Sequence, residues 1–513
     1  MHWTPPVGST REERVAKRLR SSSKFYGFLW EIRAELFEGG FEEQLIAAYK
    51  PRGQAPCPPA MLAMVMLLQR YEGLSDAGAV DAAENDRRWQ LVLGTLGEEQ
   101  APFGQGSLVR FRMKMVEHDL DRALVERTIA LAKATGKFGW KNLRVALDSS
   151  PLEGAGRVED TWNLIGRAMA RVVSVVATAL QVDEEKVIAE ARLRVLTADS
   201  VKAALDIDWD DEGAEANALR ELLAQVERLE AWVKRRVRDA SAQPPIESAL
   251  SMLRRVASQD IEPDPNGGGG PRIAKKVARD RIASLGDTEM RHGRKSKSKR
   301  FNGYKRHIAV ANGIVLSTAV LPANAREHEA TSTLLENVAR HGTLACLDID
   351  RGYLASPEVD ALHRRHVTIN SRPWSVTNDG LFTKEAFKID LHRRLVTCPG
   401  AATANIPTNG KVSFSANDCS PCEHRTRCTK SSRRSISVHR NEDLLIELRK
   451  RRTTRAGRAE LRKRVIVEHT LARIGSIQGR RARYLGARKN LLDLNRAAAI
   501  ANLHVIARIR AAA

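Results

Sequence analysis

Two acidic residues stand at the ends of apolar runs. Residues 143–147 alternate with the period of a β-strand, and Asp148 follows where this run stops. Residues 344–350 form a second apolar run that ends in acid at Asp350, after which Gly352 breaks the strand. The two patterns predict one carboxylate at the end of each of two strands, at a sheet edge.

A third acid, Glu468, lies in a helical pattern. Val465, Leu471 and Ala472 are expected to line the core-facing side of that helix, which would lie across the sheet. Two strand-borne aspartates and one helix-borne glutamate can hold two divalent ions about 3.5–4 Å apart for in-line displacement at phosphorus. Their oxygen ligands suit Mg²⁺ or Mn²⁺. The alternative, for each acid alone, is an ordinary solvated surface charge.

Asp348 competes with Asp350 for the second position. The two residues are two apart on one strand, so they share a face and parity cannot separate them. Because Gly352 ends the strand, Asp350 lies nearer the exposed edge, where a metal and its substrate must reach it. We therefore expect Asp350 to act and Asp348 to be a supporting or surface acid.

The chain is strongly basic. Its 513 residues include 84 Lys and Arg against 62 Asp and Glu, a net charge of +22. This charge favours a polyanionic partner, with nucleic acid first, and argues against a generic metabolic enzyme. No run of 18 uncharged apolar residues and no signal-peptide pattern occurs, so we expect no membrane partner and a cytoplasmic location near the bacterial nucleoid.

Basic residues gather in residues 107–114, 291–306 and 449–489. Such rows can neutralise DNA phosphates. The alternatives are solvated faces and, for the N-terminal helices, a bundle that only supports its neighbour. Residues 107–114 are expected to open a helix with three basic residues on an exposed face. The expected DNA contacts are Arg110, Arg112, Lys114, Arg294, Lys295, Lys297, Lys299, Arg300, Lys305, Arg464, Arg473, Arg480, Arg481, Arg483 and Lys489.

Four of the six cysteines are clustered. Cys398, Cys419, Cys422 and Cys428 have the spacing C-x20-C-x2-C-x5-C, whereas Cys57 and Cys346 stand alone. In a reducing compartment such clustering indicates metal binding more readily than disulfides. Four thiolates can make a tetrahedral site. The four cysteines are therefore candidates for a structural Zn²⁺ site, with a small metal-free cluster as the alternative.

The order of predicted elements matches an α/β fold with a ribonuclease-H-like mixed-sheet core. That order is a strand before Asp148, a hairpin of residues 304–311 and 314–321, a helix from 327 to about 340, the Asp350 strand, a helix from Pro357, a strand at 366–370 and a late helix with Glu468. The expected segments are a helical DNA-binding domain at 1–140, the first core strand at 141–158, a helical insertion at 159–270, further core at 271–374, a Cys-containing β-rich insertion at 375–445 and C-terminal core helices at 446–513.

The helical insertion carries a regular apolar seam. It steps by three and four residues, as in a helical hairpin or a short coiled coil, and could serve as an arm for dimer contacts. A glycine-rich segment at 264–271 ends the insertion. The seam residues are Leu219, Leu222, Val226, Leu229 and Val233.

The chain resembles bacterial insertion-sequence DDE transposases, most closely the group numbered eleven-eighty-two. The resemblance covers most of the chain. It rests on the helical region from Pro58-Pro-Ala-Met-Leu to Ser107-Leu-Val-Arg-Phe-Arg, on Ala146-Leu-Asp148-Ser-Ser-Pro-Leu, Asp280-Arg-Ile-Ala-Ser, Arg291-His-Gly-Arg-Lys-Ser, Phe301-Asn-Gly-Tyr-Lys-Arg-His307, Pro322-Ala-Asn324 and Asp350-Arg-Gly-Tyr353, and on the cysteines, Val467-Glu468 and Arg483-Tyr-Leu-Gly-Ala-Arg-Lys489.

The resemblance implies a function and a site. Asp148, Asp350 and Glu468 would be the catalytic acids that hold two Mg²⁺ or Mn²⁺ ions, and His307 would join the DNA contacts. Arg464 resembles the arginine that precedes the glutamate in related transposases, whereas Leu461 and Gly475 replace a tyrosine and a lysine of the fuller pattern.

The function expected from this resemblance is metal-dependent cleavage of double-stranded DNA at terminal inverted repeats, followed by strand transfer into target DNA. A homodimer or higher oligomer is expected in the DNA complex. One alternative is a nuclease on the same core that lacks strand transfer. Another is a catalytically inactive DNA-binding derivative of a transposase, against which the presence of all three acids counts.

Overall fold

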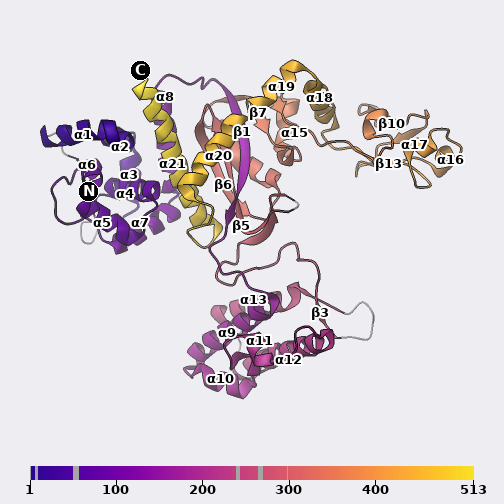
Figure 1. The fold of residues 1–513 in the computed structure, drawn as a ribbon, viewed down its shortest axis with the longest axis horizontal. Coiled ribbons are helices and arrows are strands. Elements are labelled where there is room, and N and C mark those ends of the chain that lie inside the picture. Colours follow the sequence, from indigo (N-terminus) through magenta and orange to yellow (C-terminus); the bar gives the residue numbers. More distant parts are fainter. Residues whose placement is uncertain are drawn as a thin grey trace.

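The computed structural model describes residues 2–5, 10–49, 57–237, 243–263, 270–296 and 298–512. Figure 1 shows a central sheet with N-terminal helices on one side, a helical bundle beneath it and a small cysteine-containing part at the far end. Lys297 and most of the predicted glycine-rich segment lie outside the described residues.

The central sheet is mixed. Strand β1 pairs antiparallel with β5 and parallel with β7, β7 pairs parallel with β8, and β4 and β6 both pair antiparallel with β5. The arrangement is compatible with a ribonuclease-H-like core. The predicted hairpin is present as β5 and β6, joined by Asn312 and Gly313, both with positive φ. The strands are β1 (Asn142–Glu153), β4 (Arg291–Arg294), β5 (Arg300–Ala311), β6 (Ile314–Pro322), β7 (Thr343–Ile349) and β8 (Thr368–Asn370).

Helices from the second half of the chain surround this sheet. Helix α20 packs on β1 and β5, and α21 packs on β6 and on α20. Pro357 begins α15, as predicted, because proline tolerates the first turn of a helix. These elements are η3 (Glu327–Ala330), α14 (Thr331–Ala339), η4 (Arg351–Tyr353), α15 (Pro357–Arg364), α18 (Glu442–Thr453), α19 (Arg455–Arg462), α20 (Val465–Gln478) and α21 (Ala487–Ala511).

The N-terminal helices share one continuous buried core with the sheet. Helix α21 packs against α4 and α8, and α8 packs against β6. The described N-terminal helices are therefore not separated from the central sheet by a break in the core. The helices are α1 (Thr10–Ser22), α2 (Lys24–Phe37), α3 (Phe41–Ala47), α4 (Pro59–Glu72), α5 (Asp76–Asn85), α6 (Arg87–Leu93), α7 (Gln105–Glu117) and α8 (Leu120–Ala134).

The segment after β1 folds into a helical bundle with its own core. All five seam residues are buried, but α12 packs on α9, α10 and α13, so the bundle is larger than the helical hairpin or coiled coil we expected. Within the described residues, α9 alone is long and apolar enough to cross a membrane, and half of that window is buried in the bundle. The elements are α9 (Thr161–Leu180), α10 (Glu184–Ala191), η1 (Arg194–Leu196), α11 (Val201–Leu205), α12 (Glu212–Arg236), α13 (Pro244–Gln259), β2 (Ile261–Glu262) and β3 (Arg272–Ile273).

The segment between β8 and α18 contains short strands and single-turn helices around a small third core. The elements are η5 (Lys384–Ala386), β9 (Lys388–Asp390), β10 (Leu395–Thr397), β11 (Thr403–Asn405), β12 (Lys411–Ser413), α16 (Ala416–Cys419), α17 (Arg425–Cys428) and β13 (Ser435–Ser437).

Candidate active site and cysteine site

Asp148 and Asp350 each follow one member of a residue pair on two neighbouring strands. Leu147 pairs with Ile349 in the parallel β1–β7 ladder, so the next position on each chain is an aspartate. The structure corrects one expectation: β1 continues past Asp148 to Glu153, so Asp148 is within a central strand. Strand β7 ends at Ile349, directly before Asp350. Asp350 caps η4, and its carboxylate accepts a hydrogen bond from the Arg351 N–H at 2.8 Å.

Helix α20 carries Glu468, and Arg464, which precedes this helix, connects Glu468 to Asp148. The Arg464 guanidinium lies 2.8 Å from an Asp148 carboxylate oxygen and 3.3 Å from one of Glu468. The Glu468 side chain is 55% exposed, so a ligand can reach it. Arg464 thus connects Asp148 to Glu468, and the charge of Asp350 acts on Asp148.

The buried stripe of α20 differs from the one we expected. Leu471 is buried, but Val465 and Ala472 are exposed, and Val467 and Ile474 pack on the core instead. Spacings of three and four residues around Val467 define a different stripe. Glu468 follows Val467 directly and therefore lies at the margin of the packed face.

Arg306 fixes the other end of α20. Its guanidinium donates to the Gln478 side chain at 3.0 Å, to the Gly479 carbonyl at 2.9 Å and to the Ser150 hydroxyl at 2.7 Å. The residue is buried, and burial lowers the pKa of Arg306 to about 10. Arg464 at the start of α20 and Arg306 at its end hold the helix against β1 and β5.

Burial raises the pKa of Asp148 to about 6. Arg464 and the Ser149 backbone N–H oppose this increase, whereas the negative charges of Asp350 and Glu327 add to it. The increase therefore comes first from burial, which penalises the charged carboxylate, and the positive charge of Arg464 offsets part of it.

Asp348 has a structural role. Its side chain is 2% exposed and forms a bidentate pair with Arg144, at 2.7 Å for each bond. The Asn370 amide donates to the same carboxylate at 3.0 Å. Arg144 also pairs with Glu460 at 2.5 Å. Because its oxygens are engaged and buried, Asp348 ties β7 to β1, β8 and α19, which supports the choice of Asp350 for the site.

Glu327 is a fourth acid at the site, and we did not predict it. It lies at the start of η3, and its carboxylate accepts a hydrogen bond from the Ser149 hydroxyl at 2.9 Å. A Cβ on Gly352 would lie 1.8 Å from a Glu327 oxygen, so a larger residue there would displace the Glu327 side chain. Only the folded structure shows that Glu327 lies next to Gly352, so the sequence contained no signal for this acid.

Tyr353, in η4 after Asp350, contacts His307 in the core. The Tyr353 hydroxyl and His307 Nδ1 lie 2.9 Å apart, and both residues are fully buried. Burial lowers the pKa of His307 to about 3. The expectation that His307 contacts DNA is therefore wrong, because its ring is inside the core and supports the Asp350 loop.

Several predicted DNA contacts are engaged within the protein. Arg112 pairs with Asp76 at 2.5 Å, and Lys114 donates to the Ala48 carbonyl at 2.5 Å, so only Arg110 of that trio is exposed. The expected exposed face on α7 with three basic residues is therefore wrong. Lys305 donates to the Ala325 carbonyl at 2.8 Å.

Other predicted contacts remain accessible. Arg480 and Arg481, which follow α20, are exposed. Arg483, in contrast, donates to the Leu74 carbonyl at 2.5 Å, and Arg473 is half-buried beside Arg508. The exposed members of the predicted set are Arg110, Arg294, Lys295, Lys299, Arg300, Arg480, Arg481 and Lys489.

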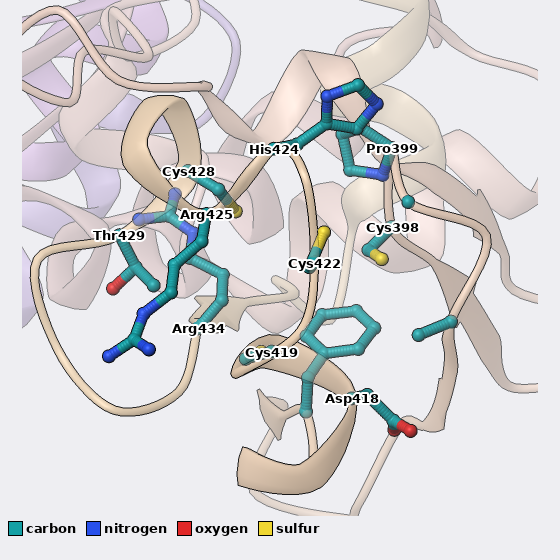
Figure 2. Close-up of a pocket in the computed structure, with 13 residues that line it drawn as sticks. Cys398, Pro399, Asp418, Cys419, Cys422, His424, Arg425, Cys428, Thr429 and Arg434 are labelled. Carbon is teal, nitrogen blue, oxygen red and sulfur yellow. The ribbon is translucent and has the colours of Figure 1, made fainter.

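The four clustered cysteines line a single pocket (Figure 2). Cys398 follows β10, Cys419 and Cys428 end α16 and α17, and Cys422 lies between these two helices. All four are half-buried free thiols. Burial raises the pKa of Cys428, and the other three thiols raise it further, whereas Arg434 lowers it.

The carboxylate set fits divalent ions. Carboxylate oxygens are the ligands that Mg²⁺ and Mn²⁺ prefer, and Arg464 shows that a cation between Asp148 and Glu468 is electrostatically favourable. Across the described ranges, no three His, Cys, Asp or Glu side chains are already gathered tightly enough to hold a metal ion. At the acids, Arg464 stands between two of the three carboxylates.

Two family models match the chain. Residues 15–114 match a model described as Transposase domain (DUF772), and residues 397–507 match one described as Transposase DDE domain. The second match includes Glu468 and all four clustered cysteines. No curated protein and no solved structure matches the chain. The two family matches support an insertion-sequence DDE transposase, and they do not confirm the group numbered eleven-eighty-two.

Proposed function

We propose that this chain cuts DNA at the ends of its own element and joins the freed 3′-hydroxyl groups to target DNA. The observation that supports the proposal is the Arg464 bridge between Asp148 and Glu468, together with the place of Asp350 one residue beyond the Leu147–Ile349 pair of β1 and β7. The net charge of +22 suits a DNA substrate.

In this proposal the chain's own part is positioning. Two bound divalent ions would stabilise charge on the attacking and leaving oxygens of a phosphodiester. Strand β1 would hold Asp148, the end of β7 would hold Asp350, and α20, which packs on β1, would hold Glu468. Arg464 offsets two carboxylates and lies where it can approach a phosphate. No side chain needs to bond covalently to the DNA.

Exposed basic residues beyond the C-terminal end of α20 would hold the DNA backbone. Arg480 and Arg481 follow α20 and approach Glu153, at the end of β1. Phosphate contacts of this kind position a duplex without reading its sequence. Because transposition brings two element ends together, we propose a homodimer or higher oligomer in the DNA complex, acting in the bacterial cytoplasm.

The test is a plasmid assay with the full-length chain. The donor plasmid carries the inverted repeats that flank the gene, a second plasmid serves as target, and Mg²⁺ or Mn²⁺ is added. We expect cuts at the repeat ends and a joined product, both lost in Asp148→Ala while DNA binding persists. Cleavage without a joined product would establish a nuclease instead. Binding without cleavage by the unaltered chain would establish an inactive derivative.

A further inference from the structure

The part of the chain that holds the clustered cysteines has little apolar core. Among its described residues, those buried in that core are Phe387, Val396, Val412, Phe414, Ile436 and Val438. Its sheets have two or three strands, and each pair of strands is paired over three residues. Units of this size usually need a disulfide or a metal in addition to their core.

Four thiols surround one small cavity in this region. The cavity has a volume of about 30 Å³, enough for one water-sized group, and Phe414 forms part of its wall. Figure 2 shows Cys398 and Cys422 next to each other, with Cys419 and Cys428 on other sides of the pocket. No cysteine here is paired in a disulfide.

Gly400 allows two of these sulfurs to approach. A Cβ at this position would lie 2.8 Å from the Cys422 sulfur and 3.8 Å from the Cys398 sulfur. The turn that follows Cys398 is closed by a hydrogen bond from the Ala401 N–H to the Cys398 carbonyl, at 3.0 Å. The backbone thus leaves open the space in which the first and third cysteines face each other.

The surrounding charge favours an anionic cluster. Arg425 and Arg434 line the same pocket, and the Arg434 guanidinium is held there by donating to the Phe382 carbonyl at 3.0 Å. Asp418 is the carboxylate among the lining residues. Four thiolates around one dication carry a net charge of −2, which two nearby guanidinium groups offset.

We propose that Cys398, Cys419, Cys422 and Cys428 bind one Zn²⁺ ion that completes the fold of this insertion. Each thiol would release its proton to solvent as its sulfur binds the ion, so formation of the site releases four protons. Small side-chain rotations toward the cavity complete the tetrahedral set, with Zn–S bonds of about 2.3 Å. The ion is structural because all four positions are filled by protein.

Zinc content of the full-length protein tests the proposal. We expect about one equivalent per chain after purification in reducing buffer and gel filtration. Cys422→Ser should lose most of it, and Cys57→Ser, at a cysteine far from the cluster in the fold, should keep it. Protein without zinc, or equal zinc in the two variants, would overturn the proposal. A disulfide among the four cysteines under non-reducing mass spectrometry would also overturn it.

A second variant leaves every thiol in place. In Gly400→Ala the new methyl group meets the Cys422 sulfur, so we expect zinc affinity to fall at least 10-fold in a competition with a chromophoric chelator. Gly139→Ala is the matched control, because a Cβ there has no neighbour within 4 Å. Limited proteolysis adds a readout: chelation should expose the insertion to cleavage and leave the sheet protected. Unchanged affinity in Gly400→Ala would contradict the proposed geometry.

Discussion

The acid site and the cysteine site are built in opposite ways. The acids come from three segments more than 100 residues apart and stand on a sheet whose core extends through the N-terminal helices. The cysteines come from one short segment with six buried apolar residues in its core. If both proposals hold, the fold around the acids exists independently of its ligand, whereas the ligand of the cysteines is part of the fold.

The difference has a practical meaning for mutations. Replacing an acid that contacts a ligand removes function and leaves the core intact. Replacing a cysteine removes one of few stabilising interactions in its region. The predictions below examine whether the acid site, with its supporting residues, behaves as this contrast requires.

The largest effect should separate Asp350 from Asp348. Asp350→Asn removes a charge from the proposed metal site, and we expect cleavage to fall roughly 10³-fold, the scale for losing one electrostatic contributor to the transition state. Stability should hardly change, because asparagine caps a helix start as well as aspartate does. Plasmid cleavage and thermal melting measure the two quantities.

Asp348→Asn should give the reverse result. It breaks a buried pair with Arg144, which costs about 3 kcal/mol of unfolding free energy. Cleavage should remain measurable below the lowered melting temperature. If Asp348→Asn abolished cleavage in folded protein and Asp350→Asn did not, the second catalytic position would be two residues earlier.

A moderate effect is expected at Glu327. Glu327→Gln keeps an acceptor for the Ser149 hydroxyl but removes a negative charge that acts on Asp148. We expect the Mg²⁺ concentration for half-maximal cleavage to rise about 10-fold, a change in free energy of about 1.4 kcal/mol, with unchanged melting. Glu329→Gln, in the same short helix but exposed, is the control. Equal metal dependence in the two variants would show that Glu327 has no role beyond packing.

A smaller effect should appear in DNA affinity. Each phosphate contact contributes about 0.9 to the slope of log K against log salt, so Arg480→Ala with Arg481→Ala should reduce that slope by about 2. Arg112→Ala should leave it unchanged, because Arg112 is paired with Asp76. Fluorescence anisotropy across a salt series measures the slopes. A reduction in the Arg112 variant alone would reverse our assignment of the basic surface.

The smallest effect concerns the buried support of the acid site. His307 stays neutral in the fold, with its pKa lowered to about 3, whereas in the unfolded chain it takes up a proton near pH 6.5. Its stabilising contribution is therefore present above pH 6.5 and is lost as the pH falls toward 3. Between pH 7 and 6 the loss is about 0.7 kcal/mol.

His307→Asn should remove that dependence. Urea unfolding at pH 7 and 6 measures it, and His392→Asn, at an exposed histidine of the cysteine region, provides the comparison. An unchanged pH dependence in His307→Asn would mean that the buried ring titrates in the folded protein.

Local patterns were sufficient to predict several elements of the core. The Asn312-Gly313 hairpin, the strand before Asp350 and the helix at Pro357 all follow from short-range rules, and the structure contains each of them. The end of β1 was missed because Ser149, Ser150 and Pro151 have the composition of a loop. Their pairing with β5 depends on residues more than 150 positions later.

Which basic residues are buried could not be predicted from the sequence. Arg306 and His307 belong to a basic run, and nothing in that run shows that their partners are Gln478 and Tyr353. Lys114 likewise looked free until its acceptor, a carbonyl on another helix, was known. Charge counts give the sign of a surface, but the fold decides which charges remain on it.

The core shared by the N-terminal helices and the sheet has a consequence for exchange between relatives. Helix α21, at the end of the chain, is the piece that joins α4 and α8 to β6. If residues 1–134 came from another transposase, they would pack against an α21 from a different protein. The side chains between α21 and helices α4 and α8 would then be mismatched. Under the proposed function, recognition and cutting would thus be inherited together, and new element ends would arise by surface substitutions on these helices rather than by replacement of the whole set of helices.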